Sequence, residues 1–502
     1  MKAPERFACL YVREFPAQAL LRLRPDLRNK PCVVMDGQPP LQQVCSLNGK
    51  AHSLGVARGM SQVEIDTFPS VVTLPRVRAE ECTAKAALLE CAGTFSPRVE
   101  DQSSDSAFVC VIDIAGTEKL FGPPDKLAEL LLKRVQDLGI LARIAISSNF
   151  HAAVCLAKGM SSKTSVTVVS AEEQNSALAP LPVAVFNLSA EHAETFSLWG
   201  IRTLGMLAAL PETELIARMG QEGKRLRQMA RGELPHLFLP VQPAFTLEER
   251  MELDSPVELL DSLLFVVSVM LEQLILRASA RVLALASVTV NLSLEGGASH
   301  VRTIRPVLPT NAKQFWIKLL HLDLEAHPPQ ASILSLRLSA EPGDTSKVQL
   351  GLFSPQLPEP MRLDVTMARI RAIVGEDCAG RAVLRDTHRP DDFRMEPFTI
   401  PSQPSETASA PPRAAVRQLR PAESVTVTLR SKRPEIFFFR EKRYTVEHAY
   451  GPWLTSGDWW NQKLWGVEQW DLVARSQDGE QLCCVLVRDL VDSRWEMAAL
   501  YD

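Results

Sequence analysis

A stretch rich in proline, serine and alanine divides this chain and constrains its architecture more than any other feature. It begins at Pro401 and reads PSQPSETASAPPRAAVRQLRPAES. This composition offers too few large apolar side chains to bury a core and is typical of a flexible linker. The 502 residues therefore cannot share one core. We predict a linker over 401–425 between a large N-terminal part and a short domain over 426–502.

The first 170 residues alternate apolar runs with helical stretches. The runs FACLYV, PCVVM, FVCVIDI and ARIAISS are typical of buried strands, whereas AEECTAKAALLECAG and PDKLAELLLKRVQDLG have helical periodicity. This order predicts an α/β domain, and a smaller helical region follows over 171–240.

Residues 241–345 predict a domain in which strands and helices alternate in a fixed order. We expect strands at 245–253, 286–294, 300–308 and 332–340, and helices at 257–281 and 312–325. This βαββαβ order is that of the ferredoxin-like unit. The longest apolar run, 263–271, is too short to span a bilayer and suits a buried helix. The chain as a whole is thus expected to be a multidomain α+β protein.

Charge and cysteine content narrow the function classes. The formal net charge is -4, so no global basic field indicates nucleic acid, and any such contact must come from local patches. The ten cysteines form no CxxC pair and no zinc-like cluster with histidine, so reduced thiols, no metal site and no cofactor are expected. The N-terminal MKAPERFACLYV lacks a signal-peptide pattern, which favours a cytoplasmic location.

Several sequence motifs, together with the order of the predicted domains, resemble those of the Y-family translesion DNA polymerases. RNKPCVVMDG with SLGVARGM is similar to the fingers signature of that family, and ISSNFHAAVCLAKGM to the strand–turn–helix that closes its palm. LWGIRTLGMLAALPETELIARMGQEGKRLRQMARGE is similar to its helix-hairpin-helix thumb. The resemblance implies a palm with inserted fingers over 1–170, a thumb over 171–240 and a little finger over 241–345.

The residues that perform catalysis in that family are replaced here. Y-family enzymes hold two Mg²⁺ ions with three carboxylates, since hard cations need anionic oxygen ligands beside the triphosphate. By the resemblance, the carboxylate positions are occupied by Tyr11, Phe108 and Val109, and two nucleotide-binding positions by Gly49 and His52. We therefore expect no catalytic residue in this palm, and no nucleotidyl transfer.

Two other acids keep an alternative open. Glu14 lies just past the end of the first predicted strand, and Asp113 aligns with a further acid common in the family, where a structural role is usual. An active translesion polymerase with these displaced ligands is the alternative, and an interaction protein without DNA contact is a second one.

Within the family, the missing acids and the C-terminal part resemble the non-catalytic ImuB type. GEDCAGRAVLRDTHRPDDFRM (375–395) is similar to the block that ends the polymerase-like part of that type, and GPWLTSGDWW with RDLVDSRWEMAALYD is similar to its C-terminal domain. The resemblance implies a scaffold for damage-induced mutagenesis. Its implied partners are the sliding clamp (beta subunit), an error-prone C-family DNA polymerase, an ImuA/RecA-like protein and DNA bound without sequence preference.

Residues 346–400 contain a candidate clamp-binding peptide before that connecting block. In KVQLGLFSP the residues Gln349, Leu350, Leu352 and Phe353 fit the pattern QLxLF. Such a peptide places its leucine and phenylalanine in an apolar groove, while glutamine fixes the register by hydrogen bonds. Turn-rich segments flank it, as expected for a displayed peptide, although an amphipathic strand end would read similarly.

Local basic patches are the candidates for DNA contact. In the predicted thumb, Gly220 and Gly223 would let backbone N–H groups approach phosphates beside Lys224, Arg225 and Arg227, although a solvated helix face has the same pattern. The segment RSKRPEIFFFREKRY could dock a partner or contact DNA, and the sequence does not decide between them. Six of the eight tryptophans lie in 426–502, which predicts a small core that also offers a partner surface.

Overall fold

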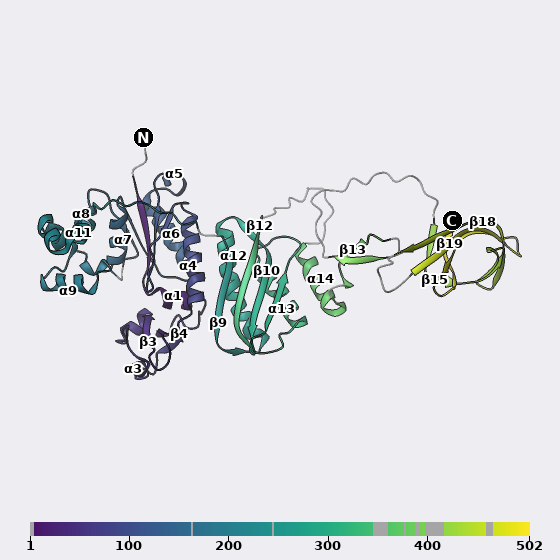
Figure 1. Ribbon diagram of the computed structural model, residues 1–502, viewed down its shortest axis with the longest axis horizontal. Helices are drawn as coiled ribbons and strands as arrows, with labels where there is room; N and C mark the ends of the chain where they lie inside the picture. Colours follow the sequence, from purple (N-terminus) through teal and green to yellow (C-terminus); the bar gives the residue numbers. More distant parts are fainter. Residues whose placement is uncertain are drawn as a thin grey trace. The chain divides into compact units, whose positions relative to one another are not determined.

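The computed structural model describes residues 5–161, 164–242, 245–344, 360–375, 378–387, 392–396, 416–457 and 465–501. It divides into two compact units, Met1–Ala368 and Arg369–Asp502. The first unit contains the palm-like, fingers-like, thumb-like and little-finger-like parts, and the second contains the C-terminal β-domain (Figure 1). The predicted fold class, a Y-family-like α+β chain with an additional C-terminal domain, is confirmed.

The palm is a five-stranded sheet in the order β5-β6-β1-β7-β8. Its strands are β1 (Phe7–Val12), β5 (Val99–Asp101), β6 (Phe108–Asp113), β7 (Arg143–Ser147) and β8 (Val166–Val168). Its helices are α1 (Phe15–Leu21), α4 (Arg78–Gly93), α5 (Glu118–Phe121), α6 (Pro124–Asp137) and α7 (Phe150–Gly159). Helices α4 and α6 cover one face of the sheet and α7 the other (Figure 1).

A fingers-like part is inserted between α1 and α4. It is a three-stranded sheet in the order β3-β2-β4 with two short helices. The elements are β2 (Cys32–Asp36), β3 (Gln43–Leu47), α2 (Gly49–Ser53), α3 (Gln62–Ile65) and β4 (Val72–Pro75). Apolar side chains alternate between the two faces along β2 and β3, and they contribute to two small apolar clusters, one on each side of this sheet.

The thumb-like part is helical and packs on α7. It consists of α8 (Gln174–Leu178), a 3-10 turn (Val183–Val185), α9 (Ala190–Leu198), α10 (Leu204–Ala209) and α11 (Glu212–Ala230). Its apolar side chains join those of α7 in one core. Helix α11 is kinked at Gly220, whose φ of 64° and ψ of -152° interrupt the helical backbone.

The little-finger-like part has the expected βαββαβ order. The elements are β9 (Leu247–Val257), α12 (Leu260–Ala280), β10 (Leu283–Leu294), β11 (Ser299–Ile304), α13 (Lys313–Ala326) and β12 (Ile333–Asp344). The sheet order is β11-β10-β12-β9, and every neighbouring pair is antiparallel. β12 therefore lies between β9 and β10, the two strands that α12 connects, which makes a split βαβ unit.

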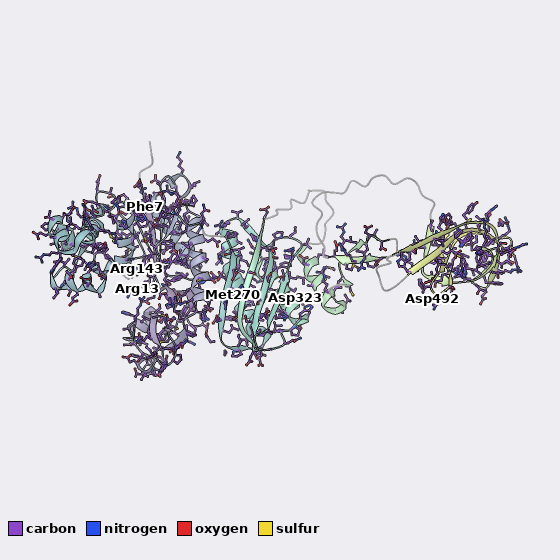
Figure 2. All side chains as sticks on the ribbon, viewed as in Figure 1. Phe7, Arg13, Arg143, Met270, Asp323 and Asp492 are labelled. Atoms are coloured by element: carbon purple, nitrogen blue, oxygen red, sulfur yellow. The ribbon has the colours of Figure 1, made fainter. Side chains whose placement is uncertain are left out.

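Helix α12 is long and apolar enough to cross a membrane by length and composition, with a mean hydropathy of 1.7. Its side chains instead form much of the little-finger core. Met270, labelled in Figure 2, is fully buried there together with Val267 and Leu274, and Trp316 of α13 packs into the same cluster. The helix is therefore explained as the core helix of a folded domain.

Buried ion pairs join the palm to the little finger. Glu249 of β9 lies between two guanidinium groups, those of Arg22, which follows α1, and of Arg277 from α12. The Arg277 Nη1–Glu249 Oε1 distance is 3.0 Å, and Arg277 Nη2 is 2.7 Å from Glu90 Oε2 on α4. All four residues are at most 4% exposed. We call Arg22, Glu90, Glu249 and Arg277 the buried ionic cluster.

A second buried contact lies beside this cluster. Arg24 donates to both carboxylate oxygens of Glu80, at 2.7 and 3.1 Å, and the backbone N–H of Glu252 in β9 donates to Glu80 Oε1 at 2.9 Å. Arg24 also donates to the Glu252 carbonyl at 2.7 Å. Arg24, in the segment after α1, and Glu80 of α4 thus engage the backbone of a little-finger strand.

The second unit begins with α14 (Pro360–Val374), which spans its boundary, and a two-stranded ribbon, β13 (Arg381–Leu384) and β14 (Phe393–Glu396). A seven-stranded sheet follows in the order β15-β21-β20-β19-β18-β17-β16. Its strands are β15 (Val416–Ser424), β16 (Thr426–Arg430), β17 (Arg433–Phe439), β18 (Lys442–Gly457), β19 (Trp465–Ser476), β20 (Gln481–Asp489) and β21 (Trp495–Tyr501).

The prediction of a linker over 401–425 was wrong at its C-terminal end. Residues 416–424 form β15, an edge strand that pairs with β21. Pro421 lies within the register shift between Gln418 and Glu423, where a strand tolerates a residue without a backbone N–H. Residues 401–415 lie outside the described residues.

Candidate functional site

Two of the three positions predicted to replace catalytic carboxylates lie side by side in the palm. Across β1 and β6, Tyr11 is paired with Val109, and Val12 with Phe108. Cross-strand partners share a face of the sheet. Tyr11 and Val109 therefore lie together on the face covered by α7, and Phe108 points to the opposite face.

Phe108 is part of the palm core. It is fully buried, and its ring centroid lies 5.6 Å from that of Phe15, the first residue of α1. Apolar side chains from α4 and α6 complete the surrounding cluster. A charged carboxylate in this environment would lose its hydration without gaining a partner. The position is used for packing.

The two cross-strand partners of Tyr11 supply no anionic oxygen for a metal ion. On the other side of β1, Tyr11 is paired with Arg143 of β7, which is labelled in Figure 2. Burial raises the pKa of the Tyr11 phenol, so it stays neutral at physiological pH. Mg²⁺ is held by carboxylate and phosphate oxygens. A neutral phenol, a valine and a neighbouring guanidinium do not replace them.

Asp113 is too far along the strand to substitute. It is paired with Phe7, four residues before Tyr11 on β1, and a strand rises about 3.3 Å per residue. The separation along β1 is therefore roughly 13 Å. The Asp113 carboxylate lies 3.2 Å from Arg98 Nη1 and accepts a hydrogen bond from the backbone N–H of Ala115 at 3.0 Å. These contacts give Asp113 a structural role at the end of β6.

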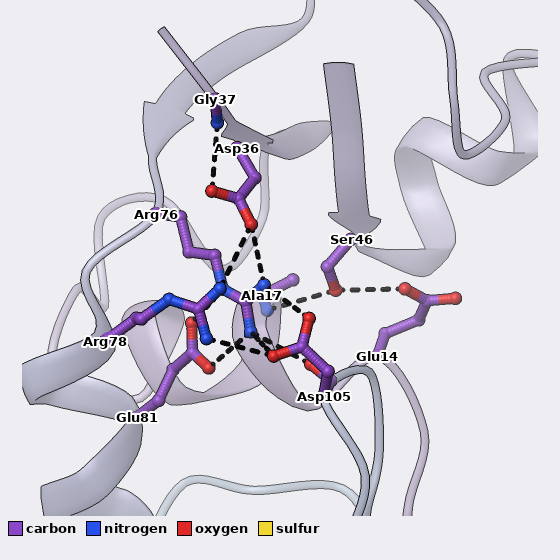
Figure 3. Close-up of polar contacts among 9 residues, drawn as sticks. All are labelled: Glu14, Ala17, Asp36, Gly37, Ser46, Arg76, Arg78, Glu81 and Asp105. Carbon is purple, nitrogen blue, oxygen red and sulfur yellow. Dashed lines mark hydrogen bonds and ion pairs between the residues drawn. The ribbon is translucent and has the colours of Figure 1, made fainter. Parts of the chain in front are cut away.

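Glu14 is also committed to other contacts. It precedes α1 with a φ of 55°, in the left-handed region, and its side chain reaches the fingers-like part (Figure 3). Its Oε2 accepts from the Ser46 hydroxyl at 2.9 Å and lies 2.7 Å from Arg58 Nη2. Ser46 in turn accepts from the Ala17 backbone N–H at 3.2 Å. Glu14 thus ties β3 to the start of α1.

An arginine-centred network beside these residues is not evident from the sequence. The buried guanidinium of Arg76 contacts Asp36, Glu81 and Asp105, each at 2.7–3.0 Å (Figure 3). Hydrogen bonds from Arg76 lower the pKa of Asp105 to about 2. Asp105 lies in the loop between β5 and β6, so this network fixes the β5–β6 loop to the fingers. The three carboxylates of this network are therefore paired with arginine.

The two predicted nucleotide positions lie on α2. Asn48 caps this helix by accepting a hydrogen bond from the Ala51 backbone N–H at 2.9 Å. Gly49 has open space around it, and His52 is exposed. Over the residues that the structure describes, no group of three histidine, cysteine, aspartate or glutamate side chains could hold a metal ion.

The two thumb glycines have different roles. Gly220 is exposed at the kink of α11, with space around it for a ligand. Gly223 is buried inside α11, and a Cβ there would lie 2.9 Å from the Leu215 carbonyl oxygen. The predicted phosphate contact at Gly223 was wrong, because this glycine permits the close packing of the helix and is not accessible to a phosphate.

The three thumb cations are held by nearby acids. Arg227 Nε donates to the Leu210 carbonyl at 2.7 Å and Arg227 Nη1 lies 3.3 Å from Glu212, which joins α10 to α11. Lys224 pairs with Glu212 at 3.0 Å, and Arg225 with Glu222 at 2.9 Å. Arg225 is exposed and Lys224 is partly exposed, so both can exchange these partners for phosphates, whereas Arg227 is mostly buried in its structural role.

The clamp-peptide prediction, Gln349, Leu350, Leu352 and Phe353, lies outside the described residues and stays a prediction. In the C-terminal domain, Trp470 is buried in the core and its indole N–H donates to Glu468 at 2.9 Å. Trp453 is about half exposed. The described tryptophans thus include a core residue and a surface residue.

Comparison with known protein families gives one match, over residues 10–158, to the impB/mucB/samB family. Protein ImuB of Caulobacter vibrioides (strain NA1000 / CB15N) is 24% identical over 420 residues, which cover 80% of this chain and 87% of that protein. DNA polymerase IV 1 of Mesorhizobium japonicum is 26% identical over 286 residues, covering 56% of this chain and 64% of that protein.

Solved structures of polymerases are also similar. The crystal structure of DinB from Sulfolobus solfataricus covers 67% of this chain and 98% of its own chain, with 16% identity and a TM-score of 0.41. A ternary complex of Dbh covers 68% of this chain with 16% identity and a TM-score of 0.40.

Proposed function

We propose, from the premise that this chain is an ImuB homologue with an impB/mucB/samB-family domain, that it is a non-catalytic scaffold in error-prone translesion DNA synthesis. The observation that carries the proposal is the pairing of Tyr11 with Val109 beside a buried Phe108. Metal-assisted nucleotidyl transfer needs carboxylates at this point of the palm. Glu14, Asp105 and Asp113 are held by Arg58, Arg76 and Arg98, which supports the proposal that these acids do not form the family's two-metal site.

A scaffold contributes to synthesis by holding another polymerase at the primer end. We infer that the peptide at Gln349–Phe353 binds the sliding clamp, and that the C-terminal domain binds an error-prone C-family polymerase and an ImuA/RecA-like protein. The protein would work in the cytoplasm on damaged DNA. Joint engagement of two weak sites raises the effective concentration of each partner, so the assembly depends on both arms.

The purified protein is expected to show no primer extension with Mg²⁺ or Mn²⁺. The reason is the lack of carboxylates at Tyr11, Phe108 and Val109. A primer–template extension assay checks this, with an active Y-family polymerase as the positive control. The alternative, an active polymerase with displaced metal ligands, predicts that the parent protein extends the primer. It also predicts that Glu14→Gln or Asp113→Asn abolishes this extension. These substitutions keep the size of the side chains, so such a result would overturn the proposal.

The thumb is expected to contribute to DNA binding through Lys224 and Arg225. Reversing both charges should weaken duplex binding by about tenfold or more, equally for all sequences. The slope of log affinity against log salt concentration should fall by the amount expected for the loss of roughly one to two phosphate contacts. Arg227 is left intact because it joins α10 to α11. The measurement is fluorescence anisotropy at several salt concentrations.

A matched charge change controls this experiment. Lys126→Glu with Lys133→Glu reverses two exposed lysines of α6 and should leave duplex affinity nearly unchanged. The ion pairs of Lys224 and Arg225 with Glu212 and Glu222 favour a second candidate function, an interaction protein without DNA contact. Equal affinity of the thumb variant and the parent protein would support that candidate.

A further inference from the structure

Three consecutive strands of the C-terminal domain form a hairpin sheet with two chemically different faces. In β16, β17 and β18, Thr426 is paired with Phe438, and Phe438 with Arg443. One position along, Val427 is paired with Phe437, and Phe437 with Tyr444. Since partners across strands share a face and neighbours along a strand alternate, these two rows lie on opposite faces.

The inner row belongs to the core of the domain. Phe437 is fully buried and Tyr444 nearly so, and their rings stack with centroids 5.2 Å apart and an interplanar angle of 9°. Because this row holds the strands in place, the outer row does not need to pack against anything in its own domain. The ring of Phe438, in the outer row, is therefore available for contact with a ligand.

The outer row presents an aromatic ring among cations and hydroxyl groups. Phe438 is 47% exposed, although the pairing places it in the middle of the three strands. Further residues of this face follow from the register. They are Thr426, Thr428, Ile436, Arg443, Thr445, Glu447 and Arg475. The acidic member, Glu447, lies at the β19 side of the face and accepts from Arg475 Nε at 2.7 Å.

The charge of this region is opposite to that of the whole chain. Residues 430–443 contain six basic residues and two acidic ones, in a chain with a net charge of -4. Some of the cations pair with glutamates at exposed positions, such as Arg430 with Glu435 at 3.0 Å and Lys442 with Glu480 at 2.9 Å. Exposed pairs of this kind contribute little and exchange readily for phosphate. The basic residues lie at both ends of β17, on either side of Phe438.

We propose that this face, Phe438 and Arg443 with the flanking threonines, binds single-stranded nucleic acid. A base stacks on the ring of Phe438, Arg443 and the cations at the ends of β17 contact phosphates, and the threonine hydroxyl groups donate to the backbone. An exposed aromatic ring within a basic strip is the arrangement by which sheet surfaces bind single strands without sequence preference. A protein partner would find little apolar area here besides Phe438 and Ile436.

This proposal goes beyond the scaffold function and does not depend on it. It places a nucleic-acid contact in the second unit, whereas the proposed thumb contact is in the first. The two contacts prefer different substrates, since the thumb would hold a duplex and the C-terminal face unpaired bases. Experiments with both substrates can therefore distinguish them.

The test uses the full chain and a fluorescein-labelled oligo(dT) of about 12 nucleotides, within the range that one such sheet domain binds. Phe438→Leu should lower the affinity about five- to a hundredfold through loss of stacking, and Phe438→Trp should retain it. Arg443→Ala should lower the affinity several-fold and reduce the salt slope by about 0.7. Duplex affinity should stay unchanged in all three variants.

Two substitutions elsewhere in the same domain serve as controls. Tyr450→Leu removes an aromatic ring that is 57% exposed on β18, and Arg494→Ala removes an exposed arginine. Neither substitution should change oligo(dT) binding. Circular dichroism checks that the Phe438→Leu variant folds. If that variant does not fold, the oligo(dT) affinity of the Arg443→Ala variant decides the test. Unchanged oligo(dT) affinity of the Phe438→Leu and Arg443→Ala variants would overturn the proposal. So would loss of a protein partner with oligo(dT) binding intact, which would assign the face to protein docking.

Discussion

Glu249→Gln is expected to lower the free energy of unfolding of this protein by about 3–5 kcal/mol, because it removes the carboxylate that pairs with two buried guanidinium groups. Glu249 is fully buried, and it is the ion-pair partner of Arg22. Two nitrogen atoms of Arg22, Nε and Nη1, already lack a hydrogen-bond partner. Without Glu249 the Arg22 charge is buried and uncompensated, whereas Arg277 keeps its contact with Glu90.

The loss is a large fraction of the total stability of a typical domain. Urea unfolding of the full chain measures it, and hydrogen exchange locates it, since β9 and α12 should lose protection first. The neighbouring Glu248→Gln is the matched control. Glu248 lies on the same strand, is 40% exposed and pairs with Arg337 at 3.4 Å, so its loss should cost at most about 1 kcal/mol.

A double variant tests the cause. Arg22→Met combined with Glu249→Gln removes the uncompensated charge along with its partner, and should recover part of the lost stability. If Glu249→Gln were no more harmful than Glu248→Gln, the buried ionic cluster would not hold the little finger against the palm in solution.

Replacing Gln349, Leu352 and Phe353 together by alanine is expected to abolish clamp binding and damage-induced mutagenesis. The clamp affinity should fall by at least about 30-fold, as is usual when the anchor residues of an interface are truncated. The fold and the C-terminal partners should be unaffected. Clamp affinity of the purified variant and induced mutation frequency in cells are the two measurements.

The same segment contains a matched control. Gln356→Ala with Leu357→Ala alters a second Gln-Leu pair that lacks the rest of the pattern, and should bind the clamp normally. Deleting 416–502, which removes the whole seven-stranded sheet, should have the complementary effect, sparing clamp binding and losing the partner polymerase. A triple variant with full clamp affinity or normal mutagenesis would contradict the proposed tether.

The domain order and most strands could be predicted because their periodicity is local. The register that pairs Tyr11 with Val109 was not predicted, because β1 and β6 are buried on both faces and their burial does not alternate in a way that would fix the pairing. The roles of Glu14 and Asp113 depended on Arg58 and Arg98, which are distant or across a turn, and no local pattern identifies such partners.

The partners of the buried ionic cluster could not be predicted from the sequence either. Along β9, Leu247, Glu249 and Met251 alternate inward, which is a sequence signal for a carboxylate inside a core. Its partners, Arg22 and Arg277, are brought there only by the packing of two domains. The end of the predicted linker was missed for a related reason, because β15 is stabilised by pairing with β21 at the other end of the domain.

The burial of Phe108 makes an acid at this position costly. Restoring an acid at this position would remove a large side chain from the packing around Phe15, which costs about 3–5 kcal/mol for a phenylalanine in a core, and would also bury a charge. The metal site of the family uses three carboxylates, so one acid placed at this position would lower stability without completing such a site. The packing of Phe108 therefore opposes stepwise substitution toward that site.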